Sequence, residues 1–310
     1  MVKFPLGGTQ SIVAVDRRAG EIGAAVLSQS FASGSKMIWS EPGVGVVVAQ
    51  GSVEPSYGPL ALALLKGGKN PQQTLKSLLA TDLRPAVRQV MIIDSKGRKA
   101  AHTGKGTLPL AGHQSGRGFC VQASFVGARR GWASLAASFR RGRGPLAERL
   151  VSALEAGELA TKGHRRGGAP RSASLVVVAT KPSGTPWEGR VLDLRVDDSD
   201  NPVRELRRVL RVQDAYRHAE SGGELVAKGD VERGQKEFAK AAAMAGDGSE
   251  FMLWLALGLL KRGDTKRGAA ALSRVLGRGH DVKAVMRELA GSGLVGKPPV
   301  QKQDAKPSHV

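Results

Sequence analysis

The chain reads TQSIVAVDRRAGEIGAAVLS over residues 9–28, and this stretch decides the fold. Residues 11–15 (SIVAV) and 22–27 (IGAAVL) are short runs of residues that favour β-strands. The link between them, DRRAGE at 16–21, is polar, contains a glycine and is typical of a hairpin turn. The sequence therefore predicts that the protein opens with two antiparallel strands.

Further strands and helices follow this hairpin in blocks. Residues 37–39 and 44–49 flank a second turn signal, Glu41-Pro42-Gly43, and form a second predicted strand pair. Apolar residues recur at helical spacing over 59–65 and 71–79, which predicts two helices. Strands are then expected at 90–93, 99–102 and 118–126, a helix-rich stretch at 132–159, and two more strands at 174–179 and 189–196. This order favours an α+β fold of four αββα layers, with stacked antiparallel sheets between helices.

The pattern beyond Asn201 is wholly helical and contains an internal repeat. Gly229, Asp230, Arg233, Gly234 and Phe238 are matched 34 residues later by Gly263, Asp264, Arg267, Gly268 and Leu272. This is the tetratricopeptide period, and two units are too few to bury a continuous core alone. We therefore expect the repeats to pack against the first domain or another subunit, and we expect a homodimer. The predicted segments are a propeptide at 1–8, the αββα domain at 9–210, the tetratricopeptide-like region at 211–295 and a disordered tail at 296–310.

Composition narrows the classes of function. The single cysteine excludes an intramolecular disulfide and multi-cysteine metal sites, and we expect neither a metal nor a cofactor. The net charge is +20, but aromatic residues make up only 4% of the chain, and single-stranded nucleic-acid binding by stacking needs more of them. We therefore expect no specific nucleic-acid partner. No apolar run is long enough to span a bilayer, and no signal peptide is evident, so we expect a cytoplasmic protein without a membrane partner.

The junction Gly7-Gly8-Thr9 stands directly before the first predicted strand. A Gly-Thr junction is where N-terminal-nucleophile hydrolases cut their own chain. The exposed threonine then supplies Oγ as nucleophile and its own α-amino group, of ordinary pKa about 7.7 to 8.0, as the neighbouring base. The glycines leave the backbone free to adopt the turn that self-cleavage requires.

Further positions can complete such a centre. Lys36 is a lone cation in an uncharged stretch, and a buried lysine beside the nucleophile would lower the pKa of the hydroxyl and hold the α-amine neutral. Ser28, after the second strand, can orient that group. Gln50, Gly51 and Ser52 end the fourth strand, where a glycine N–H can face a developing oxyanion. The alternative is that Lys36 is a surface lysine and Gly51 a turn glycine.

Several blocks in a fixed order carry a resemblance to a known family. They are residues 11–16 (SIVAVD), 43–50 with 55–59, 88–90, 112–113 with 116–122, 144–150, and 193–198 with 205–208. In these blocks, over about residues 9–210, the chain resembles domain-of-unknown-function family 1028. The family is grouped with the N-terminal-nucleophile hydrolases, and many members carry a repeat-like helical tail. The resemblance implies a four-layer sandwich of that class.

The resemblance also implies roles for individual residues. The family begins with a threonine just before its Ser-Ile-Val-Ala strand, which falls on Thr9. A looser similarity to the proteasome β-subunit superfamily suggests Lys36 as the catalytic lysine and Gly51 as the oxyanion donor. The interval between Thr9 and Lys36 is several residues shorter than in that superfamily.

Two departures from the family pattern count against the hypothesis that the protein is an enzyme. The chain has VQAS at 121–124 where the family commonly has Val-Gln-Gly-Asn, and GHRRG at 163–167 where it has Gly-Asp-Arg-Arg-Gly. Gln122, Ser124 and His164 are candidate substrate-binding residues, together with Gln50 and Ser52. The alternatives are that Ser124 is a plain strand residue and that His164 is a solvated loop residue.

Two functions follow from this sequence. The first is a threonine amidohydrolase that removes residues 1–8 and cleaves a small-molecule or peptide-like amide with Thr9 as nucleophile. The second is a catalytically inactive binding or assembly protein whose helical tail recruits a protein partner. Only the first requires a free Thr9.

Overall fold

The structure is a computed structural model that describes residues 7–125, 131–162, 168–182, 184–185, 188–277 and 281–293. The chain divides into two compact units, Met1–Val209 and Leu210–Val310. The strands are β1 (Thr9–Asp16), β2 (Glu21–Ser28), β3 (Ile38–Glu41), β4 (Gly45–Gly51), β5 (Arg88–Asp94), β6 (Lys99–Thr103), β7 (Gly112–Gly116), β8 (Phe119–Ser124), β9 (Ser172–Ala179) and β10 (Arg190–Val196). The helices are α1 (Gly34–Met37), α2 (Tyr57–Lys66), α3 (Pro71–Thr81), the 3-10 turn η1 (Pro85–Val87), α4 (Gly131–Arg141), α5 (Leu146–Thr161), α6 (Pro202–Lys228), α7 (Val231–Ala245), α8 (Ser249–Lys261), α9 (Thr265–Leu276) and α10 (Val282–Gly291).

The first unit contains two antiparallel sheets. The six-stranded sheet has the order β10-β9-β2-β1-β8-β7, and the four-stranded sheet has the order β3-β4-β5-β6. The predicted opening hairpin is confirmed: β1 and β2 pair from Thr9 opposite Ser28 to Asp16 opposite Glu21. Its turn is fixed by the Asp16 carboxylate, which accepts backbone N–H bonds from Arg18 and Ala19.

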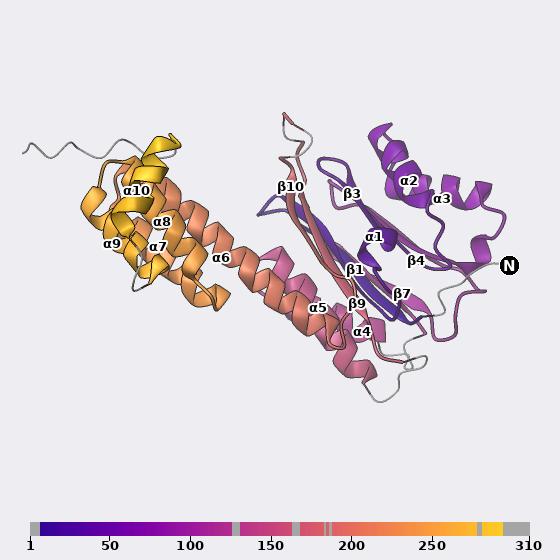
Figure 1. Cartoon of the computed structure of the whole chain (residues 1–310). Helices are drawn as coiled ribbons and strands as arrows, with labels where there is room; N and C mark the ends of the chain where they lie inside the picture. The colour runs from indigo at the N-terminus through magenta and orange to yellow at the C-terminus, as the bar shows by residue number, and fades with distance from the viewer. Residues whose placement is uncertain are drawn as a thin grey trace, which may run out of the picture. The chain divides into compact units, whose positions relative to one another are not determined.

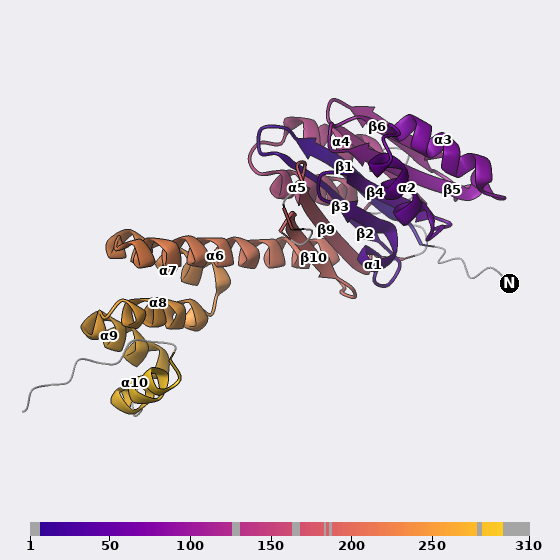
Figure 2. The same ribbon diagram turned by 90° about the horizontal axis from the view of Figure 1, so that it is seen from above.

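Helices cover the outer face of each sheet. Helices α4 and α5 pack on strands of the six-stranded sheet, and α2 and α3 pack on strands of the four-stranded sheet. Figures 1 and 2 show the resulting order of helices, sheet, sheet and helices. Local signals explain where these helices begin; α3, for example, starts at Pro71 after a capping box formed by Asn70 and Gln73.

The layer between the two sheets is apolar through most of its length. Both sheets contribute alternate residues to it because successive side chains on a strand point to opposite faces. Its buried members are Val13 and Val15 of β1, Ile22, Ala24 and Val26 of β2, Met37 of α1, Val46 and Val48 of β4, Met91 and Ile93 of β5, Cys120 of β8, and Val176 and Val178 of β9. This core fixes how the ends of the strands face each other across the layer.

Two local features differ from the prediction. Residues 112–116 form strand β7, which the sequence did not indicate because GHQSG contains two glycines and no apolar side chain. The stretch before β3 begins with the one-turn helix α1, which contains Lys36. β7 is an edge strand, so its pairing with β8 rather than side-chain burial decides its structure.

The second unit is helical, as expected, and the 34-residue repeat has a structural counterpart. Asp230 and Asp264 cap α7 and α9, each accepting the backbone N–H of the arginine three residues later. Phe238 and Leu272 are buried at equivalent places in those helices. The predicted tail at 296–310 lies outside the described residues. No helix in the described part of the chain is both long and apolar enough to cross a bilayer.

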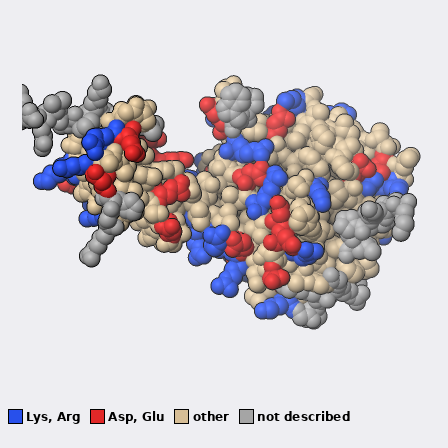
Figure 3. All heavy atoms as spheres, in the orientation of Figure 1, with Lys and Arg blue, Asp and Glu red and all other residues tan. Residues whose placement is uncertain are grey.

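Charged side chains of both signs are interspersed over the first unit. On the face drawn in Figure 3, blue Lys and Arg side chains lie among red Asp and Glu side chains. Several of these are ion pairs within the unit; Arg207, for example, pairs with Glu148 and Glu155 of α5. The net charge of +20 is therefore not gathered into a single patch on that face.

Candidate active site

Four hydroxyl side chains form a row across one end of the six-stranded sheet. The strand register places Ser172 opposite Ser28, Ser28 opposite Thr9, and Thr9 opposite Ser124. All four are buried, with at most 1% of each exposed. They share the face that carries Val13 and Val26 further along the strands, so the row continues the inter-sheet layer as its polar end.

Thr9 and the peptide bond before it are held by hydrogen bonds to the end of β2. The hydroxyls of Thr9 and Ser28 lie 2.8 Å apart. The Gly8 carbonyl oxygen accepts the backbone N–H of Gln29 at 3.0 Å, and the Gly8 N–H donates to the Gln29 side-chain carbonyl at 2.6 Å. The Thr9 hydroxyl therefore has a hydroxyl partner on β2, and the carbonyl of the preceding peptide bond has a backbone N–H partner on the same segment.

Gln50 of the four-stranded sheet crosses the layer to this site. Its amide group donates to the Thr9 backbone carbonyl at 3.2 Å and to the Gln89 side-chain carbonyl at 2.7 Å. Its own carbonyl accepts the Ser11 hydroxyl at 2.6 Å. Gln50 thus satisfies its polar atoms while connecting β1 with β4 and β5.

Other polar atoms in the same end of the layer have no hydrogen-bond partner among the described residues. They are both side-chain polar atoms of Gln122 and the hydroxyls of Ser124 and Ser174. Gln122 and Ser124 are fully buried on β8, next to Ser11 and Thr9 in register. A buried polar group left without any partner costs about 1–3 kcal/mol, so each of these groups requires an explanation.

The segment that follows β4 is fixed by a buried arginine. Gly51 has a backbone φ of +74°, a conformation that favours glycine, and pairs with Arg88 of β5. The Arg88 guanidinium donates to the Ser52 carbonyl at 2.9 Å and pairs with Asp82 at 2.6 Å and Glu54 at 3.3 Å. Its hydrogen bond to Asp82 holds the pKa of that carboxyl well below its usual range. The predicted site residue Ser52 therefore lies beside the ion pairs that Arg88 forms with Asp82 and Glu54.

Lys36 does not have the buried environment that one interpretation of the sequence requires. The sequence left open both a buried catalytic lysine and a surface lysine; Lys36 is exposed on α1, with its ammonium 5.7 Å from the centre of the Phe31 ring. The physical reason is that burial of an ammonium without a carboxylate is costly, and an ion pair with a carboxylate of the described residues is absent. The exposure of Lys36 agrees with the surface alternative and not with the buried one. His164 lies outside the described residues.

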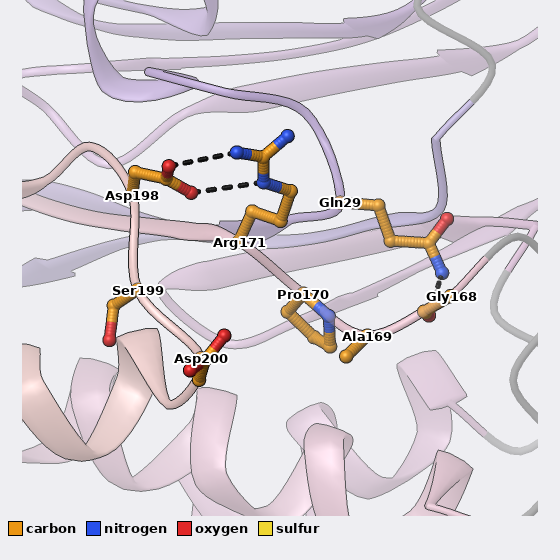
Figure 4. A pocket seen from close by; sticks show the side chains of 8 residues that line it. All are labelled: Gln29, Gly168, Ala169, Pro170, Arg171, Asp198, Ser199 and Asp200. Atoms are coloured by element: carbon orange, nitrogen blue, oxygen red, sulfur yellow. Dashed lines mark hydrogen bonds and ion pairs between the residues drawn. The ribbon is translucent and has the colours of Figure 1, made fainter.

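A polar hollow borders the Gly8–Thr9 junction through Gln29. It has a volume of about 560 Å³ and is lined by Gln29, Gly168, Ala169, Pro170, Arg171, Asp198, Ser199 and Asp200. Figure 4 shows the Arg171–Asp198 ion pair on one side and the Gln29 amide reaching the Gly168 carbonyl, at 2.6 Å, on the other. Gln29 therefore has two roles. The oxygen of its side-chain amide accepts the Gly8 N–H, and the nitrogen of the same amide donates to Gly168 at the wall of the hollow.

Several residues of the polar end were not predicted. Ser11, Gln89 and Ser172 join Thr9, Ser28 and Gln50 in it. The signal that could have found Ser11 is alternation, because it lies two residues after Thr9 on the same strand face. Gln89 and Ser172 come from distant parts of the chain, and only the pairing of the sheets shows that they belong here. No cluster of three potential metal-ligating side chains occurs among the residues described.

Comparison with known proteins places the first unit in a family. A model of the family of unknown function DUF1028 matches residues 9–206. The crystal structure of a protein from Silicibacter pomeroyi, assigned to the same family, is similar to this chain with a TM-score of 0.59 and 25% sequence identity, over 66% of this chain and 84% of that one. No functionally curated protein shows significant similarity. The chain belongs to the DUF1028 family.

Proposed function

We propose that this protein is an amidohydrolase of the N-terminal-nucleophile type that cleaves its own Gly8–Thr9 bond and then uses Thr9 as its nucleophile. The single observation that carries the proposal is the geometry at this bond. The Thr9 hydroxyl lies 2.8 Å from the Ser28 hydroxyl, while the carbonyl of the bond to be cut accepts the N–H of Gln29. The order of helices, sheet, sheet and helices is the one expected for this class of hydrolase.

The self-cleavage step uses the Thr9 hydroxyl and the carbonyl of the peptide bond that precedes it. The Thr9 hydroxyl oxygen attacks the Gly8 carbonyl carbon, and its proton passes to the leaving Thr9 nitrogen, with Ser28 as a hydroxyl that orients or relays it. The resulting ester is hydrolysed by water, which leaves Gly8 with a carboxylate and Thr9 with a free amine. The N–H of Gln29 is positioned to stabilise the negative charge on the Gly8 oxygen.

The same residue then serves intermolecular amide cleavage. The free α-amine of Thr9 takes the hydroxyl proton as Oγ attacks the substrate carbonyl, and it gives that proton to the departing amine as the acyl-enzyme forms. Water then hydrolyses the ester, which releases the acid product and restores the Thr9 hydroxyl. Thr9 is only 1% exposed while Gly7 and Gly8 precede it, so removal of residues 1–8 would also open the site. Gly51 is the proposed oxyanion donor, and the unpaired side chains of Gln122 and Ser124 are available to a substrate.

Intact-mass spectrometry tests the proposal. We expect the purified protein to lose residues 1–8, and the Thr9→Ala variant to keep them. Thr9→Ser should still be cut, and Ser28→Ala should be cut about tenfold more slowly because the nucleophile loses its hydroxyl partner. Thr107→Ala, which removes a threonine hydroxyl in the loop after β6, is the matched control and should be cut like the wild type.

A reactive β-lactone then asks whether the new terminus is nucleophilic. We expect one acyl group on Thr9 of the cut protein and none on the Thr9→Ala variant. A wild-type chain that keeps residues 2–8 after prolonged incubation, or that is acylated only elsewhere, contradicts the proposal. That result would favour the second function, an inactive sandwich whose helical unit binds a protein partner.

A further inference from the structure

A second hollow lies at the ends of β2 and β4. It has a volume of about 510 Å³ and is lined by Ser30, Phe31, Ser35, Lys36, Met37, Trp39, Val53 and Pro55. Most of its lining area comes from apolar groups, because two aromatic rings, a methionine, a valine and a proline surround it. Phe31 is 55% exposed, which is unusual for a phenylalanine and leaves its ring available for contact.

One cation stands over this apolar lining. The Lys36 ammonium lies 5.7 Å from the centre of the Phe31 ring, and it forms no ion pair with a carboxylate of the described residues. An unpaired ammonium beside aromatic walls is complementary to an organic anion with an apolar body.

This hollow is linked to Thr9 by a short path. The backbone N–H of Ser30, which lines the hollow, donates to the Ser28 hydroxyl at 3.1 Å, and Ser28 in turn contacts Thr9. On the other sheet, Val53 lies two residues after Gly51. The hollow therefore lies beyond the end of β2, whose Ser28 contacts the proposed nucleophile, and beyond the end of β4, whose last residue Gly51 is the proposed oxyanion donor.

We propose that this hollow binds a small organic carboxylate with an aromatic or branched apolar body. The carboxylate pairs with Lys36, and the body lies against Phe31 and Trp39. Lys36 is thus a binding residue rather than a buried catalytic lysine. A further consequence, which rests on the proposed function, is that the substrate is a small amide carrying a carboxylate at one end.

Binding of two matched probes to the full chain tests this assignment. The probes are 2-naphthoate and its neutral counterpart 2-naphthylmethanol, measured by isothermal titration calorimetry. We expect Lys36→Met to weaken 2-naphthoate about tenfold, which corresponds to loss of one charge-assisted contact, and to leave 2-naphthylmethanol unchanged. Lys105→Met, an exposed lysine in the loop after β6, makes the same change in net charge and should alter neither affinity.

A second variant tests the apolar wall. Phe31→Ser removes an exposed ring, so the fold should survive, and both probes should bind several-fold more weakly. The assignment is overturned if 2-naphthoate shows no saturable binding, or if Lys36→Met and the wild type bind it equally. The same titration on Thr9→Ala separates the two proposals: binding to an uncut chain supports this inference even if self-cleavage fails.

Discussion

The two ends of the inter-sheet layer are built on the same strands and the same alternation, yet they differ in chemistry. At one end β1, β2, β4, β5, β8 and β9 contribute aliphatic side chains, methionine and one cysteine, all buried. At the other end the same strands contribute Thr9, Ser11, Ser28, Gln50, Gln89, Gln122, Ser124, Ser172 and Ser174. Neither end is exposed, so solvent contact does not explain the polarity.

The difference teaches which part of the layer holds the fold and which part is specialised. Each aliphatic side chain buried in the apolar end stabilises the fold by about 1.5–3 kcal/mol. In the polar end some groups are bonded, as Gln50 is, while Gln122 and Ser124 have no partner among the described residues. Proteins keep such locally unfavourable choices mainly at functional sites.

The largest expected effect comes from a cavity in the apolar end. Ile93 is fully buried between the sheets, so Ile93→Ala should lower the free energy of unfolding of the first unit by about 2–5 kcal/mol. Leu83→Ala is the control, because Leu83 is 98% exposed and the loss should stay within about 0.5 kcal/mol. Urea denaturation followed by far-UV circular dichroism measures both. A loss below about 1 kcal/mol for Ile93→Ala would mean that the apolar end does not hold the sheets together.

A smaller effect is expected at the rim of the polar end, with a defined dependence on pH. Asp82 accepts bonds from Arg88 and from the Tyr57 hydroxyl, and Arg88 in turn holds the Ser52 carbonyl. Because the bond to Arg88 lowers the pKa of Asp82, its carboxylate stabilises the fold above its ordinary pKa of about 3.9. That stability is lost as the pH falls below this value. Asp82→Asn should cost about 2 kcal/mol at pH 7.

The dependence of the free energy of unfolding on pH separates loss of the Arg88–Asp82 ion pair from any other effect of the substitution. Between pH 5 and pH 3 the wild type should lose stability more steeply than Asp82→Asn, because the variant has no carboxylate to protonate at that position. Asp198→Asn is the control: this aspartate pairs with Arg171 at the surface, with half of its side chain exposed, and contributes little. Parallel profiles for wild type and Asp82→Asn would refute the role assigned to Asp82.

Much of this fold could be predicted from the sequence, because many of its strands and helices are defined by residues that are close together in the chain. Alternation and turn residues define the β1–β2 hairpin, proline and a capping box define α3, and aspartates define the starts of α7 and α9. The sequence missed β7, because GHQSG has no alternating apolar residues to indicate a strand. β7 forms because it pairs with β8, and this pairing depends on the tertiary structure rather than on the residues of β7 alone.

The candidate site was predictable only in part. Thr9 and Ser28 stood out because of their position at strand ends, and the family resemblance supported Thr9. The uncharged stretch around Lys36 was compatible with a buried or a surface lysine, and in the structure Lys36 lies exposed on α1. Ser172 lies more than 140 residues after Ser28, and no periodicity relates them; the β2–β9 register brings them together.

The sharpest comparison within the polar end is between two buried glutamines. Gln50→Met removes three hydrogen bonds and leaves the Thr9 carbonyl and the Ser11 hydroxyl without that partner, so it should lower the free energy of unfolding by about 1–3 kcal/mol. Gln122→Met replaces an amide without a partner by an apolar side chain of similar volume, and should be neutral or stabilising by up to about 1 kcal/mol. Both variants are measured in the Thr9→Ala background, so that chain cleavage does not contribute. Equal losses for the two would show that the Gln122 amide is bonded in solution, and the contrast between satisfied and unsatisfied groups would not describe this end of the layer.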